Sequence, residues 1–281
     1  MKKWFFILGI ILHLIANEAN AQNCSDGIVA CGTTDDGFTW SVSNIVDKNG
    51  NTTQELRIEG VGDMQDYERD GDNMSPWKKN GGDISITKII VGDGITSIGA
   101  HAFEDMHYVN DLQLSESIKK IGNAACNWCA SLADIKLPSG LIELGTYAFY
   151  ATKFSNLSLP ENLTQIGNCS LYTRSPMDIV IPENTKISSL AFLSESGTTD
   201  VQKIYCASTN TSCLALKNID EFASKIQLYE KYGDAYYIDG KFYKKLNDIV
   251  FKNNIKKRIY TIDEANLVAK PSGNTVRIKY R

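Results

Sequence analysis

The chain has 281 residues, of which 43% are hydrophobic and 22% are charged, and its formal net charge is −4 at pH 7. This length accommodates one or two folded domains, and nothing in the composition indicates a disordered chain. Beyond the first residues, no stretch is apolar enough to form a transmembrane helix.

The first 21 residues have the pattern of a secretory signal peptide. Lys2 and Lys3 precede an apolar run of 12 residues from Trp4 to Ile15, and the small-residue cleavage pattern Ala19-Asn20-Ala21 follows. The apolar run is short for a bilayer span, so an uncleaved membrane anchor is the less favoured alternative. We predict a mature chain that begins at Gln22 and is exported. It is secreted or held at the cell surface, with the periplasm as a further location.

Export permits disulfides, and the chain contains seven cysteines. Two pairs are spaced to close short loops, and we predict that Cys24 pairs with Cys31 and Cys206 with Cys213.

Residues 22–85 are predicted to form an N-terminal cap. The stretches "FTWSVSN" and "QELRIEG" each alternate apolar and polar residues, and Asn49-Gly50 between them is a strong hairpin signal. We expect a β-hairpin in which Trp40, Tyr67 and Trp77 pack.

Residues 86–221 contain a repeat. An Ile-Gly pair at Ile98-Gly99 returns as Ile121-Gly122, Leu144-Gly145, Ile166-Gly167 and, more weakly, Ile187-Ser188, at spacings of 23, 23, 22 and 21 residues. An apolar-x-x-apolar-x-apolar element accompanies it. Its copies are Ile86/Ile89/Val91, Val109/Leu112/Leu114, Leu132/Ile135/Leu137, Phe154/Leu157/Leu159, Ile179/Ile181 and Val201/Ile204/Cys206.

A period in the low twenties with this spacing is typical of a leucine-rich solenoid. One coil cannot bury its apolar side alone, so successive coils stack and their strands pair in parallel. We predict a mainly β fold with short helical turns, a right-handed leucine-rich repeat solenoid of about five coils. The Ile-Gly pair is interpreted as the turn on the other side of each coil. The Ala-Phe pairs that follow it, such as Ala102-Phe103, fill the interior.

Motifs for catalysis are lacking, and we predict no enzymatic activity and no cofactor. The motif Cys126-Asn127-Trp128-Cys129 falls in the repeat with both cysteines inward, which favours buried thiols or a local disulfide over redox or zinc chemistry. His101 is expected at the surface. The acidic stretch Asp66 to Asn73 has some features of a calcium loop but lacks the closing Glu, so we expect a solvated loop.

The outward positions of the strands form the candidate partner-binding surface, which we call the strand face. Stacking places them in two columns, Asp111, Asp134, Asn156 and Asp178 in one and Gln113, Lys136, Ser158 and Val180 in the other. Carboxylates at this spacing repel one another unless solvent and the nearby Lys136 compensate, or a partner or cation does.

Residues 222–281 differ from the rest of the chain in charge. They hold 13 Lys and Arg against 6 Asp and Glu, whereas residues 22–221 hold 14 against 26. Two interpretations remain open, a C-terminal cap with a solvated basic face and an attachment region for anionic envelope material. Nucleic acid would suit the charge but not an exported protein. The candidate envelope-binding residues are Lys244, Lys245, Lys256, Lys257 and Arg258.

The stretches "GDGITSIGAHAF" and "SLADIKLPSGLIELGTYAF" resemble the BspA-like (Treponema pallidum type) leucine-rich repeat family. The resemblance covers roughly Cys31 to Cys206, and it departs from the family pattern where Leu171 replaces Phe and Ser188 replaces Gly. It implies a secreted or surface-attached protein without enzymatic activity, in a family with members implicated in adhesion. We expect a protein that binds a protein or glycan partner on another cell, on host matrix or in its own envelope. The alternative is a structural spacer of the cell envelope anchored by residues 222–281.

Overall fold

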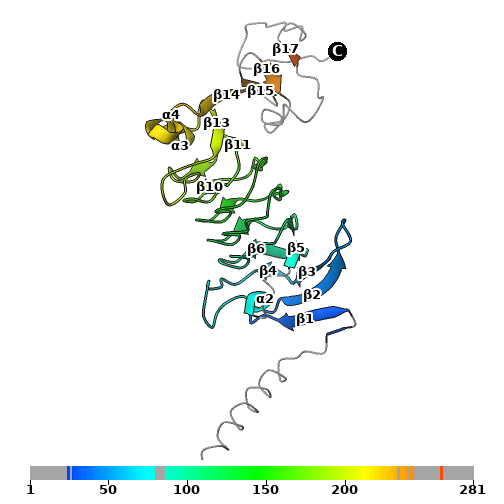
Figure 1. Cartoon of the computed structure of the whole chain (residues 1–281). Coiled ribbons are helices and arrows are strands. Elements are labelled where there is room, and N and C mark those ends of the chain that lie inside the picture. Colours follow the sequence, from blue (N-terminus) through cyan, green and yellow to red (C-terminus); the bar gives the residue numbers. More distant parts are fainter. Residues whose placement is uncertain are drawn as a thin grey trace, which may run out of the picture.

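The computed structural model describes residues 24–25, 27–79, 86–232, 235–238, 241–243 and 260–261. Coils of chain stack on one another, from an antiparallel sheet near the N-terminus to the short helices α3 and α4 near the other end (Figure 1). The fold is mainly β with few short helices, as predicted. The predicted signal peptide lies outside the described residues.

An antiparallel hairpin begins the fold. Strand β2 (Thr39–Val46) pairs with β3 (Thr52–Glu59) along their whole lengths, and β1 (Ile28–Thr33) pairs with the other edge of β2. Gly50 in the turn between β2 and β3 has a φ of +84°, a conformation that glycine adopts without steric cost. The hairpin predicted from Asn49-Gly50 is therefore confirmed.

The segment predicted as a cap also supplies the first coil. Strand β3 pairs in parallel with β5 (Ile86–Val91), and β4 (Gly62–Asp63) pairs in parallel with β6 (Ile95–Ile98). Helix α2 (Pro76–Lys79) closes this coil. The sequence of this first coil lacks the Ile-Gly pair. For this reason about five coils were predicted, whereas the sheet that contains β4 and β6 has six strands.

Trp77 on α2 fills the interior of this first coil. Its indole Nε1 donates to the carbonyl of Ala102 at 2.8 Å, and its ring lies 6.4 Å from that of Trp40 and 5.4 Å from that of Tyr67. The three aromatic residues expected to pack together do so.

The first side of the solenoid is only partly a regular sheet. Strand β5 pairs in parallel with β7 (Asp111–Gln113), where this sheet ends. Residues 132–137 form no strand, and residues 154–159 contribute one isolated bridge, Asn156 to Asp178. Parallel pairing resumes with β11 (Met177–Val180), β13 (Val201–Ala207) and β14 (Ile226–Tyr232).

A second parallel sheet lies where the sequence was interpreted as a turn. The apolar residue of each Ile-Gly pair belongs to a strand of this sheet, and the glycine lies at a tight stacking point. A Cβ on Gly122 would lie 2.7 Å from the backbone nitrogen of Ala100, in the preceding coil. The glycine therefore serves close approach between coils. The sheet continues from β6 through β8 (Lys120–Ile121), β9 (Glu143–Leu144), β10 (Gln165–Ile166) and β12 (Lys186–Ile187).

The third side of each coil is a turn that points its apolar residues inward. Phe103, Phe149 and Phe192 are all fully buried. Cys126 takes the place of the Phe in its own coil, and Cys129 is also fully buried. Both cysteines are free thiols, which is one of the two outcomes expected for them.

Short helices cover the last coil. They are α3 (Thr211–Leu214), the 3-10 helix η2 (Ala215–Asn218) and α4 (Asp220–Ala223). Phe222 on α4 is fully buried, and its ring contacts that of Phe192 at 6.1 Å.

Beyond the helices, β14 continues the parallel sheet and begins an antiparallel extension. Strand β15 (Ala235–Ile238) pairs with β14 and with β16 (Lys241–Tyr243), and β16 pairs with β17 (Tyr260–Thr261). Strands β15 and β16 thus form an antiparallel hairpin.

Candidate functional site: the strand face

The strand face owes its polar character to alternation along each coil. Leu112, Leu157 and Leu159 are buried in the main core, and Ile135 and Leu137 are each 7% exposed. The residues between them point outward, so the predicted register is correct.

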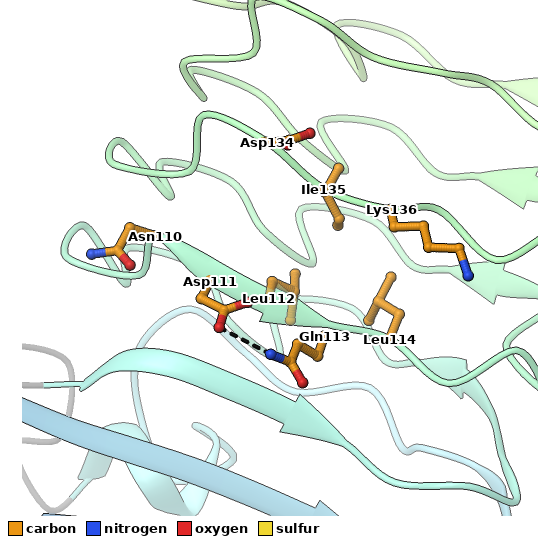
Figure 2. Close-up of a pocket in the computed structure, with 8 residues that line it drawn as sticks. All are labelled: Asn110, Asp111, Leu112, Gln113, Leu114, Asp134, Ile135 and Lys136. Carbon is orange, nitrogen blue, oxygen red and sulfur yellow. Dashed lines mark hydrogen bonds between the residues drawn. The ribbon is translucent and has the colours of Figure 1, made fainter. Parts of the chain in front are cut away.

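An open depression of about 390 Å³ lies on the strand face (Figure 2). It contains four of the eight predicted partner-binding residues. Its lining is Asn110, Asp111, Leu112, Gln113, Leu114, Asp134, Ile135 and Lys136. The depression therefore lies between β7 and the following coil, and it combines an apolar floor with polar and charged walls.

A break in the backbone ladder coincides with this depression. Strand β7 pairs with β5 on one side, whereas no backbone hydrogen bond joins residues 111–114 to residues 133–137 within this fully described stretch. The second sheet remains paired between the same two coils, since β8 pairs with β9. Peptide groups on the strand face are thus left available beside the depression.

The charges of the depression are arranged differently from the expectation. The carboxylate of Asp111 accepts a hydrogen bond from Gln113 Nε2 at 3.0 Å (Figure 2). Lys136 was expected to compensate the aspartates, but its Nζ lies 2.7 Å from Glu116 Oε1. This contact, with two hydrogen bonds from Ser139, lowers the pKa of Glu116 to about 2. Asp134 is exposed.

Two lysines in the first column were missed from the sequence. The strand register places Lys88 beside Asp111 and Lys203 beside Asp178. Both occupy the outward position of the same repeat element, in "ITKIIV" and "VQKIYC", so the repeat itself carried the signal. Lys88 also pairs with Glu55 at 2.8 Å. The acidic column is therefore bounded by a cation at each end.

Val180 does not belong to the accessible strand face. It is 1% exposed and packs in a separate apolar cluster with Tyr205, Ala207, Tyr229 and Tyr236. The hydroxyl of Tyr229 donates to the carbonyl of Ile181 at 2.9 Å. Strands β14 and β15 supply Tyr229 and Tyr236, so an outward residue becomes buried by a later segment of the chain. Asn156, Ser158 and Asp178 remain partly exposed.

The remaining candidate residues have the following positions. The structure pairs Cys24 with Cys31 and Cys206 with Cys213, the two pairs predicted from the spacing. The five candidate envelope-binding residues, Lys244, Lys245, Lys256, Lys257 and Arg258, lie outside the described residues.

His101 and the acidic loop are engaged in contacts within the protein. The side chain of His101 is 33% exposed, and its Nδ1 contacts the buried carboxylate of Glu104. In the acidic loop, Asp66 Oδ1 accepts from the backbone nitrogen of Ala100 at 2.7 Å. Among the described residues, no cluster of three or more His, Cys, Asp or Glu side chains has an arrangement suited to a metal ion.

The stacked coils, the two parallel sheets and the buried repeat residues define a leucine-rich repeat solenoid. Residues 82–199 match the BspA type leucine-rich repeat region in six copies. The chain therefore carries a leucine-rich repeat region of the BspA type, as the sequence resemblance indicated.

Solved structures of bacterial leucine-rich repeat proteins are similar to the chain. One from Eubacterium ventriosum is 22% identical, over 71% of this chain and 46% of its own, with a TM-score of 0.47. One from Bacteroides ovatus is 19% identical, over 69% of this chain and 52% of its own, with a TM-score of 0.39. The TpLRR protein of T. pallidum is 13% identical, over 65% of this chain and 91% of its own, with a TM-score of 0.34.

The chain thus spans about half the length of the first two structures. No curated protein matches it. Within the part of the chain that the structure describes, no helix has the length and apolar character needed to cross a membrane.

Proposed function

We propose that the protein is an exported binding protein that takes a protein or glycan partner on the strand face. The observation that carries this proposal is the depression between β7 and residues 134–136, at a break in the backbone ladder. Unpaired peptide groups there offer hydrogen bonds to a partner, and Leu112, Leu114 and Ile135 offer apolar contact. Extended surfaces of stacked repeats are a common binding site in solenoid proteins.

Export is supported by the signal-peptide pattern of residues 1–21 and by the typical surface association of the BspA-type family. N-terminal sequencing of the protein recovered from outside the cytoplasm should begin at Gln22. Recovery of an intact Met1 in a membrane pellet would contradict this part of the proposal.

The binding proposal is tested with the mature chain immobilised against host matrix and envelope fractions. Gln113→Ala and Asp134→Asn should weaken capture of the partner, because both side chains line the depression. Gln165→Ala is a matched control, since Gln165 is equally an exposed glutamine but lies on β10 of the second sheet. Equal capture by all three variants and the unaltered chain would refute a strand-face site.

A second candidate function, a structural spacer of the cell envelope, is favoured by the charge difference between residues 222–281 and the rest of the chain. Under this alternative, strand-face variants bind and localise normally. Replacing Lys244, Lys245, Lys256, Lys257 and Arg258 by Gln would then release the folded protein from the envelope. Attachment of the unaltered chain would weaken as salt rises, since the screening length falls below about 8 Å above physiological ionic strength. Unchanged localisation of the five-residue variant would remove this candidate.

A further inference from the structure

A ladder of aromatic rings runs along the solenoid on a surface separate from the strand face. We call His107, Trp128, Tyr150 and Tyr172 the aromatic ladder; they come from successive coils. The ring centroids of His107 and Trp128 are 6.4 Å apart, those of Trp128 and Tyr150 are 6.3 Å apart, and those of Tyr150 and Tyr172 are 5.0 Å apart. Tyr147 supports the ladder through an edge contact with Tyr150 at 5.2 Å.

Trp128 presents its side chain to solvent from a strained backbone position. It is 38% exposed and has a φ of +60°, a region that bulky residues rarely adopt. The corresponding residues of the neighbouring coils are Asp105 and Ala151, with φ values of +63° and +60°. At all three positions the backbone nitrogen donates a hydrogen bond to a carbonyl of the next coil. The fold therefore accepts small or polar side chains here, and the exposed indole is not required for stacking the coils.

Two cations flank the ladder without a carboxylate partner. The guanidinium of Arg174 lies 5.7 Å from the ring centroid of Trp128. An isolated bridge between Thr152 and Thr173 places the backbone of Lys153 beside that of Arg174. Both side chains are exposed, and among the described residues neither is within ion-pair distance of an Asp or Glu.

Polar groups at the edges of the rings complete the surface. The ring Nδ1 of His107 lies 2.8 Å from the carbonyl of Trp128, which fixes the imidazole beside the indole. Further along the ladder, the hydroxyl of Tyr150 accepts from the backbone nitrogen of Glu195 at 3.4 Å. Desolvation by burial raises the pKa of Tyr147, and the nearby negative charge of Glu195 raises it further. The ladder therefore has the cation of Arg174 beside Trp128 and Glu195 beside Tyr150.

We propose that the aromatic ladder binds an acidic glycan, a linear chain of sugar rings that carries carboxylates. The apolar face of a pyranose ring suits an exposed indole, and a guanidinium forms bidentate hydrogen bonds with a carboxylate. The exposed rings are those of His107 and Trp128, so these two receive the sugars, whereas Tyr150 is 8% exposed and supports Trp128. Edge contacts already fix the rings, so little side-chain entropy is lost on binding.

A protein partner fits this surface less well. The apolar centre of a protein interface is typically depleted in charge. Here the exposed ring of Trp128 has the guanidinium of Arg174 5.7 Å from its centroid, and the exposed Lys153 is a second cation without an ion-pair partner among the described residues. Charge complementarity thus favours an anionic ligand with flat apolar faces, which is the chemistry of a uronic or sialic acid chain. The inference concerns a different surface from the strand face and does not depend on it.

The test uses the mature chain and a galacturonic acid hexamer, with the carboxyl-reduced hexamer as the neutral probe. Titration calorimetry should show binding of the acidic probe and at least about tenfold weaker binding of the neutral one. Trp128→Ala should weaken binding of the acidic probe by about tenfold or more. This variant keeps its fold, because Ala151 occupies the same position in the next coil. Arg174→Gln should remove the preference for the acidic probe.

Lys186→Gln is the matched control, since Lys186 is an exposed cation on β12 of the second sheet, outside both the strand face and the aromatic ladder, and it should leave binding of the hexamer unchanged. The protein should also report binding through its fluorescence, since Trp40 and Trp77 are buried while Trp128 is exposed. Absence of hexamer binding would overturn the proposal, as would equal binding of the neutral probe or unaltered binding by Trp128→Ala. A captured partner that depends on Trp128 but resists glycosidase and is removed by protease would overturn it in favour of a protein ligand.

Discussion

At the scale of single residues, left-handed backbone positions recur with the repeat. Within the described residues, two such series run along the turn side, His101, Ala124, Tyr147 and Cys169 in one and Asp105, Trp128 and Ala151 in the other. Each position costs a non-glycine residue about 1–2 kcal/mol. The cost is tolerated because the backbone there donates to the next coil, as from Ala124 to the carbonyl of Thr146 at 2.8 Å.

This strain leads to the first prediction. Ala124→Gly should leave the free energy of unfolding nearly unchanged, because relief of about 1–2 kcal/mol at φ +52° offsets the lost burial of its methyl group and the added entropy of the unfolded chain. Ala125→Gly is the control one residue away. Ala125 is fully buried and has no positive φ, so its loss of a methyl group should destabilise by about 1–2 kcal/mol. Urea denaturation distinguishes the two, and destabilisation of equal size in both variants would contradict this account.

The second prediction concerns Glu116. Its carboxylate accepts from Lys136 Nζ and from the backbone and hydroxyl of Ser139, and its pKa falls from 4.5 to about 2. A lowered folded-state pKa gives stability that is fully present above pH 4.5 and is lost as the pH falls through about 2. Glu116→Gln should therefore flatten the pH dependence of the urea midpoint in that window. Lys136→Ala should reproduce part of the change, and an unaltered slope in Glu116→Gln would refute it.

At the scale of the coil, the spacing between coils is set by the Ile-Gly corner. Gly99, Gly122, Gly145 and Gly167 each have backbone atoms of the preceding coil so near that an added Cβ would come within 3 Å of them. The fifth corner has Ser188, whose hydroxyl contacts Asn168. The solenoid therefore has no room for a Cβ at these four corners and admits a side chain at the fifth.

Gly122→Ala should accordingly destabilise the protein by about 1–3 kcal/mol, as overpacking does in a dense interior. Backbone atoms form the contact, so a rotamer change cannot relieve it. Ser188→Ala, at the corresponding corner of the last coil, removes only a hydroxyl and should cost about 1 kcal/mol or less. Thermal unfolding compares the two. A Gly122→Ala variant as stable as the unaltered chain would show that neighbouring coils can separate at low cost.

The inward residues of the coils could be predicted from the sequence because alternation and a fixed period depend only on local spacing. Val180 shows where such reasoning ends. Its register is outward as predicted, but Tyr229 and Tyr236, from a later segment, cover it. The depression beside β7 could not be predicted either, since "LADIKLP" has the strand pattern yet forms no ladder with residues 111–114. Register is local information, whereas coverage and pairing depend on contacts between distant segments.

At the scale of the whole molecule, the solenoid depends on the closure of its two ends. The first coil is covered by β1 and β2, and the last by Leu216 on η2 and Phe222 on α4. Because each coil contacts only its neighbours, loss of one cover should affect the adjacent coils first. The two disulfides lie near these covers, and each closes a loop with a sequence separation of 7.

This equality gives a matched pair of variants for the last prediction. Replacing Cys206 and Cys213 together by Ala should cost about 2.5 kcal/mol by loop entropy, and the double replacement of Cys24 and Cys31 has the same entropic term. The two double variants should differ in the strands where amide exchange becomes faster. Loss of the pair that links β13 to α3 should speed amide exchange in β13 and β14, while β8 and β9 in the middle remain protected. Loss of the first pair should act on β1 and β2. Uniformly faster exchange through all coils in either variant would contradict end-by-end stability and indicate that the solenoid unfolds as a single unit.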